Sequence, residues 1–284
     1  MNKSKIFRYI LITPVIIYAI FLILLPILYI VAISFLQHDI YGGIINKFTL
    51  ENYVNVFNSI YVAVFLKSFA IAIVATIICI AIAYPFIIFI SEKSSIKRNV
   101  LITLVIIPFL TNSLIRMYGS VILLRKDGVI NNFLESINVI SHPLNLMYNN
   151  TGIIIGMVYT LLPFMILPLY SSMSKINKSL LEAAADLGAS KIKTFKKIIL
   201  PLTVPGLFNG ALMVFMPAIG YFFISDILGG GKLMLLGNLI KNQFLTARNW
   251  PFGAAIAVML LVLTFIMVKI YKRVGGKMDE LGGF

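Results

Sequence analysis

Long uninterrupted runs of apolar residues, separated by shorter polar segments, dominate this 284-residue chain. A membrane-spanning helix needs about 20 predominantly apolar residues to cross roughly 30 Å of hydrocarbon. Runs of this kind predict six transmembrane helices, near Ile10–Phe35, Val64–Ile90, Val100–Ile115, Gly152–Leu169, Thr203–Ile224 and Gly253–Tyr271. The runs do not alternate apolar and polar residues as membrane-barrel strands do. The pattern therefore predicts an all-α polytopic membrane protein in which residues 1–284 form one transmembrane domain.

Composition agrees with this class, because 60% of the residues are hydrophobic and only 12% are charged, and the mean hydropathy is +0.98. The first apolar run is longer than the apolar core of a signal peptide and lacks a small-residue cleavage site. We therefore expect it to be retained as a helix. The lipid bilayer is the expected environment of the whole chain.

The formal net charge of +14 is distributed unevenly. With the N-terminus inside, sixteen of the 24 lysines and arginines fall in the N-terminal segment, residues 91–99, residues 171–202 and the C-terminal tail. This excess follows the positive-inside rule. We therefore expect a multi-pass membrane protein with both termini in the cytoplasm. Because topology accounts for the charge, we expect no nucleic-acid partner.

Two outer segments carry helical periodicity. Apolar residues recur at helical spacing over 129–137, after the turn Lys126-Asp127-Gly128, and over 233–244, after three consecutive glycines. The spacing predicts an amphipathic helix in each segment. A solvated loop with accidental periodicity is the alternative.

The sequence offers no metal or nucleotide site of a known pattern. His38 and His142 lie in different outer segments, and Cys79 is the single cysteine and is expected to be a packing residue. No phosphate-binding loop of the GxxxxGK[ST] type is present. We therefore expect no cofactor on this chain, and any nucleotide must be bound by another chain.

The inner loop at about 171–202 has the most distinctive pattern. Apolar residues between 180 and 188 form one helical face, and Glu182 and Asp186, spaced i and i+4, place two acids beside it. Gly188 permits a sharp change of direction. Ile192, Phe195 and the pair at 198–199 are then expected to share one face, with lysines toward anionic headgroups. An interfacial helix that merely returns the chain to the membrane is the alternative.

The spacing in this loop resembles that of a known family. Glu182-Ala183-Ala184, Gly188, Ile198 and Leu200-Pro201 match the EAA–x3–G–x9–I–x–L–P pattern of the inner-membrane permeases of ABC importers. Further segments resemble the spermidine/putrescine permeases of this family, from about the second span to the last. These segments are Thr111–Arg116, Leu162–Tyr170, Ser225-Asp226 and Trp250–Gly253.

The resemblance implies a type I importer half, not a catalyst. Its expected partners are a second homologous permease subunit, two copies of an ATP-binding subunit that carry ATP and Mg, and an extracytoplasmic polyamine-binding protein. The inner loop would be the helix that couples to the ATPase. The residues implied in this coupling are Glu182, Ala183, Ala184, Asp186, Gly188, Ile198, Leu200 and Pro201.

A polyamine is a flexible polycation, so its route should present acids and aromatic faces. Asp226, with Tyr221 and Phe222 beside it, supplies both at the outer end of the fifth run, and Tyr159 is a further aromatic candidate. The alternative is an ordinary aromatic belt with a boundary acid.

Two other functions stay open. An ABC permease of the same architecture for ferric ion or a sugar-like molecule is the nearer one. An ion-gradient carrier or a membrane-embedded enzyme is the more distant one, and it would need carboxylates or convergent acid–base groups within the spans.

Overall fold

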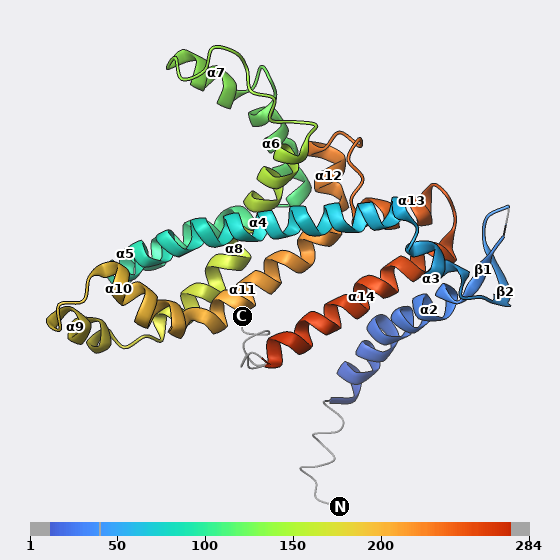
Figure 1. Ribbon diagram of the computed structural model, residues 1–284, viewed down its shortest axis with the longest axis horizontal. Coiled ribbons are helices and arrows are strands. Elements are labelled where there is room, and N and C mark those ends of the chain that lie inside the picture. Colours follow the sequence, from blue (N-terminus) through green and yellow to red (C-terminus); the bar gives the residue numbers. More distant parts are fainter. Residues whose placement is uncertain (1–11, 40, 274–284) are drawn as a thin grey trace, which may run out of the picture. The chain divides into compact units, whose positions relative to one another are not determined.

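Figure 1 shows a computed structural model of the chain, which describes residues 12–39 and 41–273 and the side chains as far as residue 270. The contacts divide it into two compact units. One unit holds the described residues up to Ala63 together with Leu239–Phe265, and the other holds Val64–Asn238 and the described residues from Ile266. The extreme basic segments at both ends, on which the topology prediction partly depends, lie outside the described residues.

Helices form almost all of the described secondary structure, as the sequence predicts. In chain order the elements are η1 (Ile20–Leu24), α2 (Leu25–Ser34), β1 (Leu36–His38), β2 (Ile44–Phe48), α3 (Glu51–Val56), α4 (Ser59–Ser91), α5 (Ser95–Ile106), η2 (Ile107–Leu110), α6 (Ser113–Leu124), α7 (Val129–Ser136), α8 (Asn150–Ser174), α9 (Lys178–Asp186), α10 (Lys191–Thr194), η3 (Phe195–Ile199), α11 (Leu200–Gly220), α12 (Phe222–Leu228), α13 (Leu236–Leu245) and α14 (Trp250–Arg273). The helices α7 and α13 confirm the two amphipathic helices predicted for the outer segments.

Five described helices are long and apolar enough to cross a membrane: Ile12–Ser34, Ser59–Ser91, Asn150–Ser174, Lys191–Gly220 and Trp250–Ile270. They correspond to five of the six predicted runs. The remaining run, Val100–Ile115, lies in a pair of helices, Ser95–Leu110 and Ser113–Ser136, that is bent by 98° and makes a sixth span if the pair counts as one. Pro108 lies in a 3-10 turn before the bend, and the Asn112 side chain accepts a hydrogen bond from the Leu114 backbone to cap the next helix. The chain therefore changes direction at two polar residues within an apolar run.

The fifth run also ends earlier than its apolar pattern suggests. The apolar pattern predicts an end at Ile224, but α11 ends at Gly220. Tyr221, with ψ 79°, is outside the helical region and separates α11 from α12. Pro217 removes a backbone donor from the last turns of α11. Of the residues proposed for the substrate route, Phe222 and Asp226 therefore lie on the separate short helix α12, and Tyr221 lies at the break before it.

The first unit contains a β-hairpin that the sequence did not predict. Its strands β1 and β2 pair antiparallel, with Leu36 opposite Phe48. The Asn52 amide donates to the carbonyls of Ser34 at 3.0 Å and Leu36 at 2.8 Å, which fastens α3 to the end of α2. In the same unit the rings of Tyr61 and Phe252 lie 4.8 Å apart, centroid to centroid.

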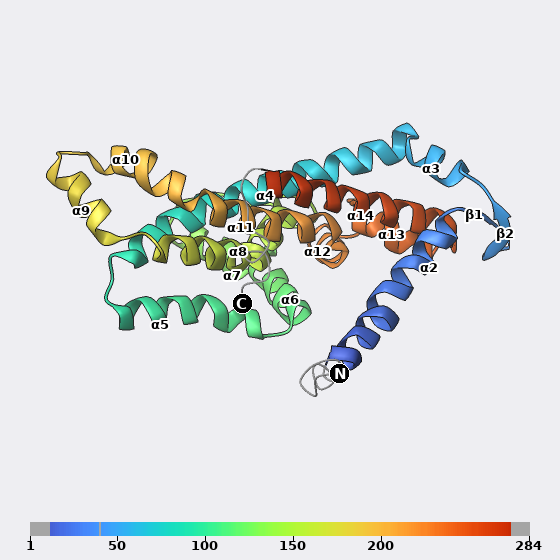
Figure 2. The same ribbon diagram turned by 90° about the horizontal axis from the view of Figure 1, so that it is seen from below.

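The core of the second unit is the contact between α8 and α11, which run side by side (Figure 2). Gly206 and Gly210 on α11 face Pro168, Ser172 and Met165 on α8 so closely that a Cβ on Gly206 would lie 2.6 Å from the Pro168 carbonyl oxygen and collide with Ser172. Small residues spaced four apart are a common way for membrane helices to bring their backbones together. The two helices thus pack backbone to backbone.

Helix α4 covers this pair with another small-residue surface. Ala72, Ala75, Cys79 and Ala83 are all fully buried, and Cys79 is a packing residue, as the sequence predicts. The Tyr84 hydroxyl lies 2.9 Å from the Thr203 hydroxyl of α11. The same tyrosine ring meets Phe195 edge to face at 5.4 Å. Tyr84 therefore contacts both α11 and the segment that enters it.

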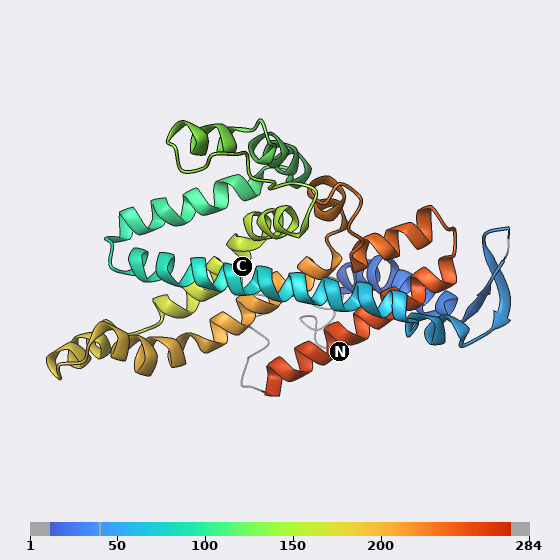
Figure 3. The same cartoon turned by 45° about the horizontal axis from the view of Figure 1, so that its top comes forward.

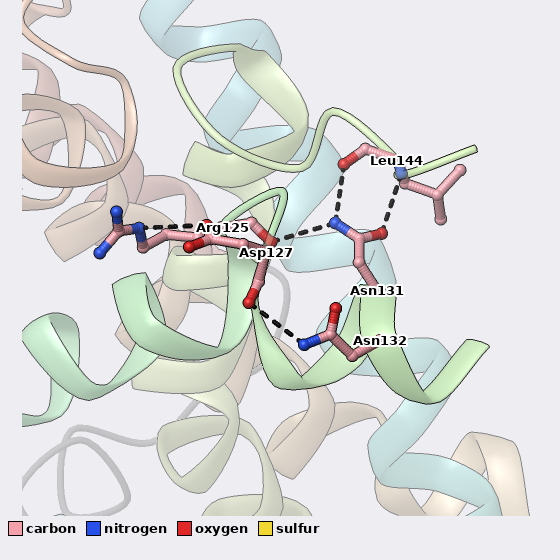
Figure 4. A network of polar contacts seen from close by, with 5 residues as sticks. All are labelled: Arg125, Asp127, Asn131, Asn132 and Leu144. Carbon is pink, nitrogen blue, oxygen red and sulfur yellow. Dashed lines mark hydrogen bonds and ion pairs between the residues drawn. The ribbon is translucent and has the colours of Figure 1, made fainter. Parts of the chain in front are cut away.

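Buried Asn131 organises the segment from α6 to α8 (Figure 4). Its side chain donates to the carbonyls of Arg125 at 3.0 Å and Leu144 at 3.1 Å and accepts from the Leu144 amide at 2.9 Å. Among the described residues, the side chain of the neighbouring Asn132 donates one hydrogen bond, to the Asp127 carbonyl at 3.3 Å. One asparagine side chain thus holds α7 against the loop that leads into α8.

Candidate functional site: the α9–α10 loop and the α12 segment

The candidate coupling loop begins at the end of α8 and continues through α9 and α10 into α11, beyond the ends of the α8–α11 pair (Figure 3). Asn177 caps the start of α9, because its side chain accepts a hydrogen bond from the Ser179 backbone at 3.1 Å. Asparagine is among the preferred residues for this position. Helix α9 therefore has a defined first residue.

The end of α9 is equally defined, and Gly188 has the role that the sequence predicts. Its φ of 72° lies in the left-handed region, which favours glycine. Gly188 donates to the Ala185 carbonyl at 2.9 Å and Ala189 donates to the Ala184 carbonyl at 2.9 Å. These two bonds form a Schellman motif, which satisfies carbonyls at the helix end. The chain turns sharply here without losing backbone hydrogen bonds.

Beyond the turn, Ser190 caps α10 by accepting from the Lys193 backbone at 3.4 Å. The segment Phe195–Ile199 is a π-helical turn that continues directly into α11, where Pro201 lies in the first turn. Pro201 is exposed, and Leu200 and Ile198 are half-buried. Because the helix is continuous here, Pro201 removes one backbone donor within it.

Burial differs from residue to residue within the loop. Ala184 is buried against the protein, whereas Glu182, Ala183 and Asp186 are exposed, and Leu187 is 88% exposed. On the second stretch, Ile199 is buried and Phe195 half-buried, but Ile192 is 69% exposed. Within the described residues, Ile192 is therefore not covered by the protein as Ile199 is, and the prediction that these residues share one face stays a prediction. Residues 182, 183, 186, 187 and 192 thus form an exposed surface of mixed acidic and apolar character, which we call the loop surface.

A cavity of about 260 Å³ lies beside the loop surface, between the ends of α4, α8 and α9 and the start of α5. Its lining includes two acids, Glu92 and Glu182, and two cations, Arg98 and Lys178. The Arg98 Nε atom is buried and has no hydrogen-bond partner among the described residues. Glu182 therefore lies at the edge of a charged hollow.

The acid and aromatic residues proposed for a substrate route lie at the junction of α11 and α12 (Figure 1). The rings of Tyr221 and Phe223 are 5.1 Å apart, and those of Phe222 and Phe223 are 6.2 Å apart. Asp226 is half-buried, and its Oδ1 accepts a hydrogen bond of 2.6 Å from the Asn238 amide. The structure thus brings Tyr221, Phe222 and Asp226 into one segment, with the carboxylate held by a protein contact.

Buried Asn238 was not found by the sequence analysis. Besides Asp226 it donates to the Phe222 carbonyl at 3.1 Å, and its Oδ1 accepts from the Leu235 amide at 3.2 Å. A close approach of Gly237 to the Gly220 carbonyl lies next to it. The role of Asn238 cannot be predicted from its sequence neighbours, because two of its partners lie 12 and 16 residues away.

Tyr159 lies apart from this cluster, on α8, and its partner is a cation of the chain itself. The Arg116 guanidinium carbon lies 5.8 Å from the Tyr159 ring centroid and 5.6 Å from that of Phe109. Arg116 also interacts electrostatically with Tyr221. The sequence pattern does not predict these contacts of Arg116.

A helical membrane protein with a capped, acid-bearing loop of this spacing has the features of an importer permease. The chain belongs to the family of binding-protein-dependent transport system inner membrane components, whose model matches residues 1–280. It is therefore a multi-pass inner-membrane permease, a component of ABC importers that work with an ATPase and a binding protein.

Two relatives show which members of the family it resembles. It is 47% identical over 251 residues to the spermidine/putrescine transport system permease protein PotB of Escherichia coli strain K12, covering 88% of this chain and 91% of that protein. It is 45% identical over 272 residues to PotB of Salmonella typhimurium strain SL1344, covering 96% and 94%. The chain is thus PotB-like over nearly its whole length.

Solved structures confirm the fold. A bacterial ABC transporter involved in the import of the acidic polysaccharide alginate aligns with a TM-score of 0.76 and 17% identity, covering 96% of this chain and 97% of that one. At this identity the likeness concerns architecture alone.

Proposed function

We propose that this chain is the permease subunit of a polyamine importer that transports spermidine, putrescine or both. The observation that carries the proposal is the 45% identity to a spermidine/putrescine permease along 96% of the chain. The segment with Tyr221, Phe222 and Asp226 supplies the acid and aromatic groups that a polycation requires. Tyr159 is proposed as a further aromatic contact.

The proposed assembly contains a second homologous permease, two ATP-binding subunits and an extracytoplasmic polyamine-binding protein. ATP and Mg belong to the ATP-binding subunits, and no nucleic acid takes part. In this arrangement the α9–α10 loop and both termini lie in the cytoplasm of a bacterium, and residues 1–284 act as one transmembrane domain.

The loop surface is proposed as the contact with the ATPase. Exposed Glu182 and Asp186 offer charge-assisted hydrogen bonds to basic residues of the partner. Ala183 presents a small surface, and Leu187 offers an exposed apolar one. Buried Ala184, the turn at Gly188 and the run Ile198, Leu200 and Pro201 hold this surface on the end of α11. Closure of the ATPases would then move α11 through the loop.

The function is tested by uptake of radiolabelled spermidine and putrescine into proteoliposomes that contain the assembled importer and its binding protein. We expect ATP-dependent uptake of a polyamine. Transport of neither polyamine, under conditions in which the binding protein stimulates ATP hydrolysis, would refute the proposed substrate class and favour another small solute.

The coupling role is tested by Glu182→Lys, with Glu135→Lys on α7 as a control charge reversal. Losing one charge-assisted contact costs about 1.5–3 kcal/mol, so we expect the Glu182 variant to insert normally, to lose its ATPase during purification and to stop uptake. The control should keep both. Normal copurification and uptake by the Glu182 variant would remove this residue from the interface.

The topology is tested by single cysteines placed at Lys178 and at Asn249 in a Cys79→Ala background. A membrane-impermeant thiol reagent applied to spheroplasts should label the cysteine at position 249 and leave the one at 178 unlabelled. The reverse pattern would overturn the proposed orientation.

A further inference from the structure

Arg116 is a half-buried arginine on α6. It lies in the first turn of α6, after the bend that interrupts the apolar run. Its Nε is buried and has no hydrogen-bond partner, and no carboxylate in the described part of the chain forms an ion pair with it. Its contacts are instead the aromatic faces of Phe109 at 5.6 Å and Tyr159 at 5.8 Å.

The position of Tyr159 places this cation away from the ends of the membrane-spanning helices. Tyr159 follows Asn150, the first residue of α8, by nine positions, which is about 14 Å along a helix that rises 1.5 Å per residue. Lipid phosphates lie at the ends of such helices and not at this depth. An ionisable residue within the membrane is by default a functional candidate.

The Tyr159 side chain is also exposed, unlike buried residues next to it on α8. It is 44% exposed, whereas Met157 and Thr160 beside it are buried. Tyr159 and Arg116 line a hollow of about 520 Å³ between α6, α7 and α8, and its other lining residues are uncharged. The guanidinium and the tyrosine ring are therefore accessible from one space that offers the cation no counter-charge.

We propose that Arg116 tunes the affinity of the permease for amines: in the substrate-free permease its guanidinium occupies the aromatic face of Tyr159 that a substrate ammonium uses during passage, and the substrate displaces it. This inference rests on the proposed polyamine-import function. Both cations are attracted to the same ring faces. Arg116 can leave without breaking an ion pair, because it has none with the described carboxylates.

Displacement of Arg116 costs the same free energy for every amine that uses the ring, so it lowers the affinity of all of them by one common factor. Replacing one cation on the ring by another is close to neutral, so an amine with a single ammonium group binds weakly while Arg116 is present. A polyamine keeps further ammonium groups that reach other acids and rings, such as those near Tyr221, so it binds in spite of the competitor.

The test is equilibrium binding of radiolabelled spermidine, and its competition by n-butylamine, to the assembled importer in lipid nanodiscs without binding protein. For Arg116→Gln we expect at least a fivefold gain in affinity, of similar size for n-butylamine and for spermidine. Arg116→Lys keeps a cation on the ring and should behave as the unmodified protein. Arg125→Gln, the same change at an exposed arginine at the end of α6, is the matched control and should also leave binding unchanged.

A second arm shows whether the effect acts through the ring. In a Tyr159→Leu background the Arg116→Gln gain should disappear, and in a Tyr159→Phe background it should persist. An Arg116→Gln importer that assembles but shows no gain for n-butylamine overturns the inference, as does a gain that persists with Leu at position 159. If the unmodified importer takes up no polyamine, the proposed function fails as well, whereas polyamine uptake without the expected gain refutes only the role of Arg116.

Discussion

Substitutions at Gly188 separate a backbone requirement of the coupling loop from a steric one. The residue has φ 72°, and a Cβ built on it meets nothing within 4 Å. Any substitution therefore costs conformational energy within this chain but causes no collision there. An L-residue in the left-handed region costs roughly 1–2 kcal/mol, and asparagine adopts that region more readily than alanine. For a β-branched residue this region is a genuine outlier.

This reasoning predicts an order for the damage: Gly188→Asn least, Gly188→Ala next and Gly188→Val most. A loss of 1–2 kcal/mol shifts an equilibrium by a factor of about 5–30. We therefore expect the affinity of the permease pair for its ATPase to fall by about fivefold for alanine, by less for asparagine and by at least thirtyfold for valine. The measurement is titration of the purified ATPase against the permease pair in nanodiscs.

Gly231→Val is the matched control, because Gly231 has φ 68° and also meets nothing within 4 Å. It introduces the same backbone strain outside the loop surface and should leave ATPase affinity unchanged. An order that follows side-chain size, with asparagine more damaging than alanine, would refute the backbone explanation and indicate direct crowding by the partner.

Three further predictions follow from the packing. In Gly206→Val, the new Cβ would lie 2.6 Å from the Pro168 carbonyl oxygen. The midpoint of thermal unfolding in detergent should therefore fall sharply. Gly220→Ala on the same helix is the control, because a Cβ there meets nothing within 4 Å and the midpoint should change little. Asn131→Ala removes three hydrogen bonds of a buried side chain at about 1 kcal/mol each. Protease cleavage after α7 should therefore accelerate far more than for Asn132→Ala, and equal rates would contradict the assigned role. Asp226→Asn keeps an oxygen that can accept the 2.6 Å bond from its asparagine partner, so assembly should survive while spermidine uptake slows. Unchanged uptake would remove this carboxylate from the route.

The sequence predicts well what depends on local or periodic information. The membrane-spanning runs follow from apolar length, the helices α7 and α13 follow from helical spacing, and the turn at Gly188 follows from the freedom of glycine. All of these depend on residues close together in the chain.

The misses have a common physical origin. The run from Val100 to Ile115 is apolar enough for one span, but hydropathy does not register that Pro108 and Asn112 end one helix and begin another. Asn131, Asn238 and Arg116 acquire their roles from partners on other elements, which single-sequence periodicity does not contain. The burial of Ala184 likewise depends on how α9 packs against the rest of the unit.

The glycine contact between α8 and α11 limits how the permease can change shape. Gly206 and Gly210 lie against the α8 backbone, so at these positions no side chains separate the two helices. If α8 slid along α11, larger side chains next to these glycines would collide with the backbone of the other helix. Packed elements of this kind move as rigid bodies, with rotation confined to a few loop or terminal residues. In this unit the helices are interrupted at Tyr221, at Thr111-Asn112 and at Gly188, and these breaks can serve as hinges. A force on the α9–α10 loop would then rotate α8 and α11 together as one rigid body.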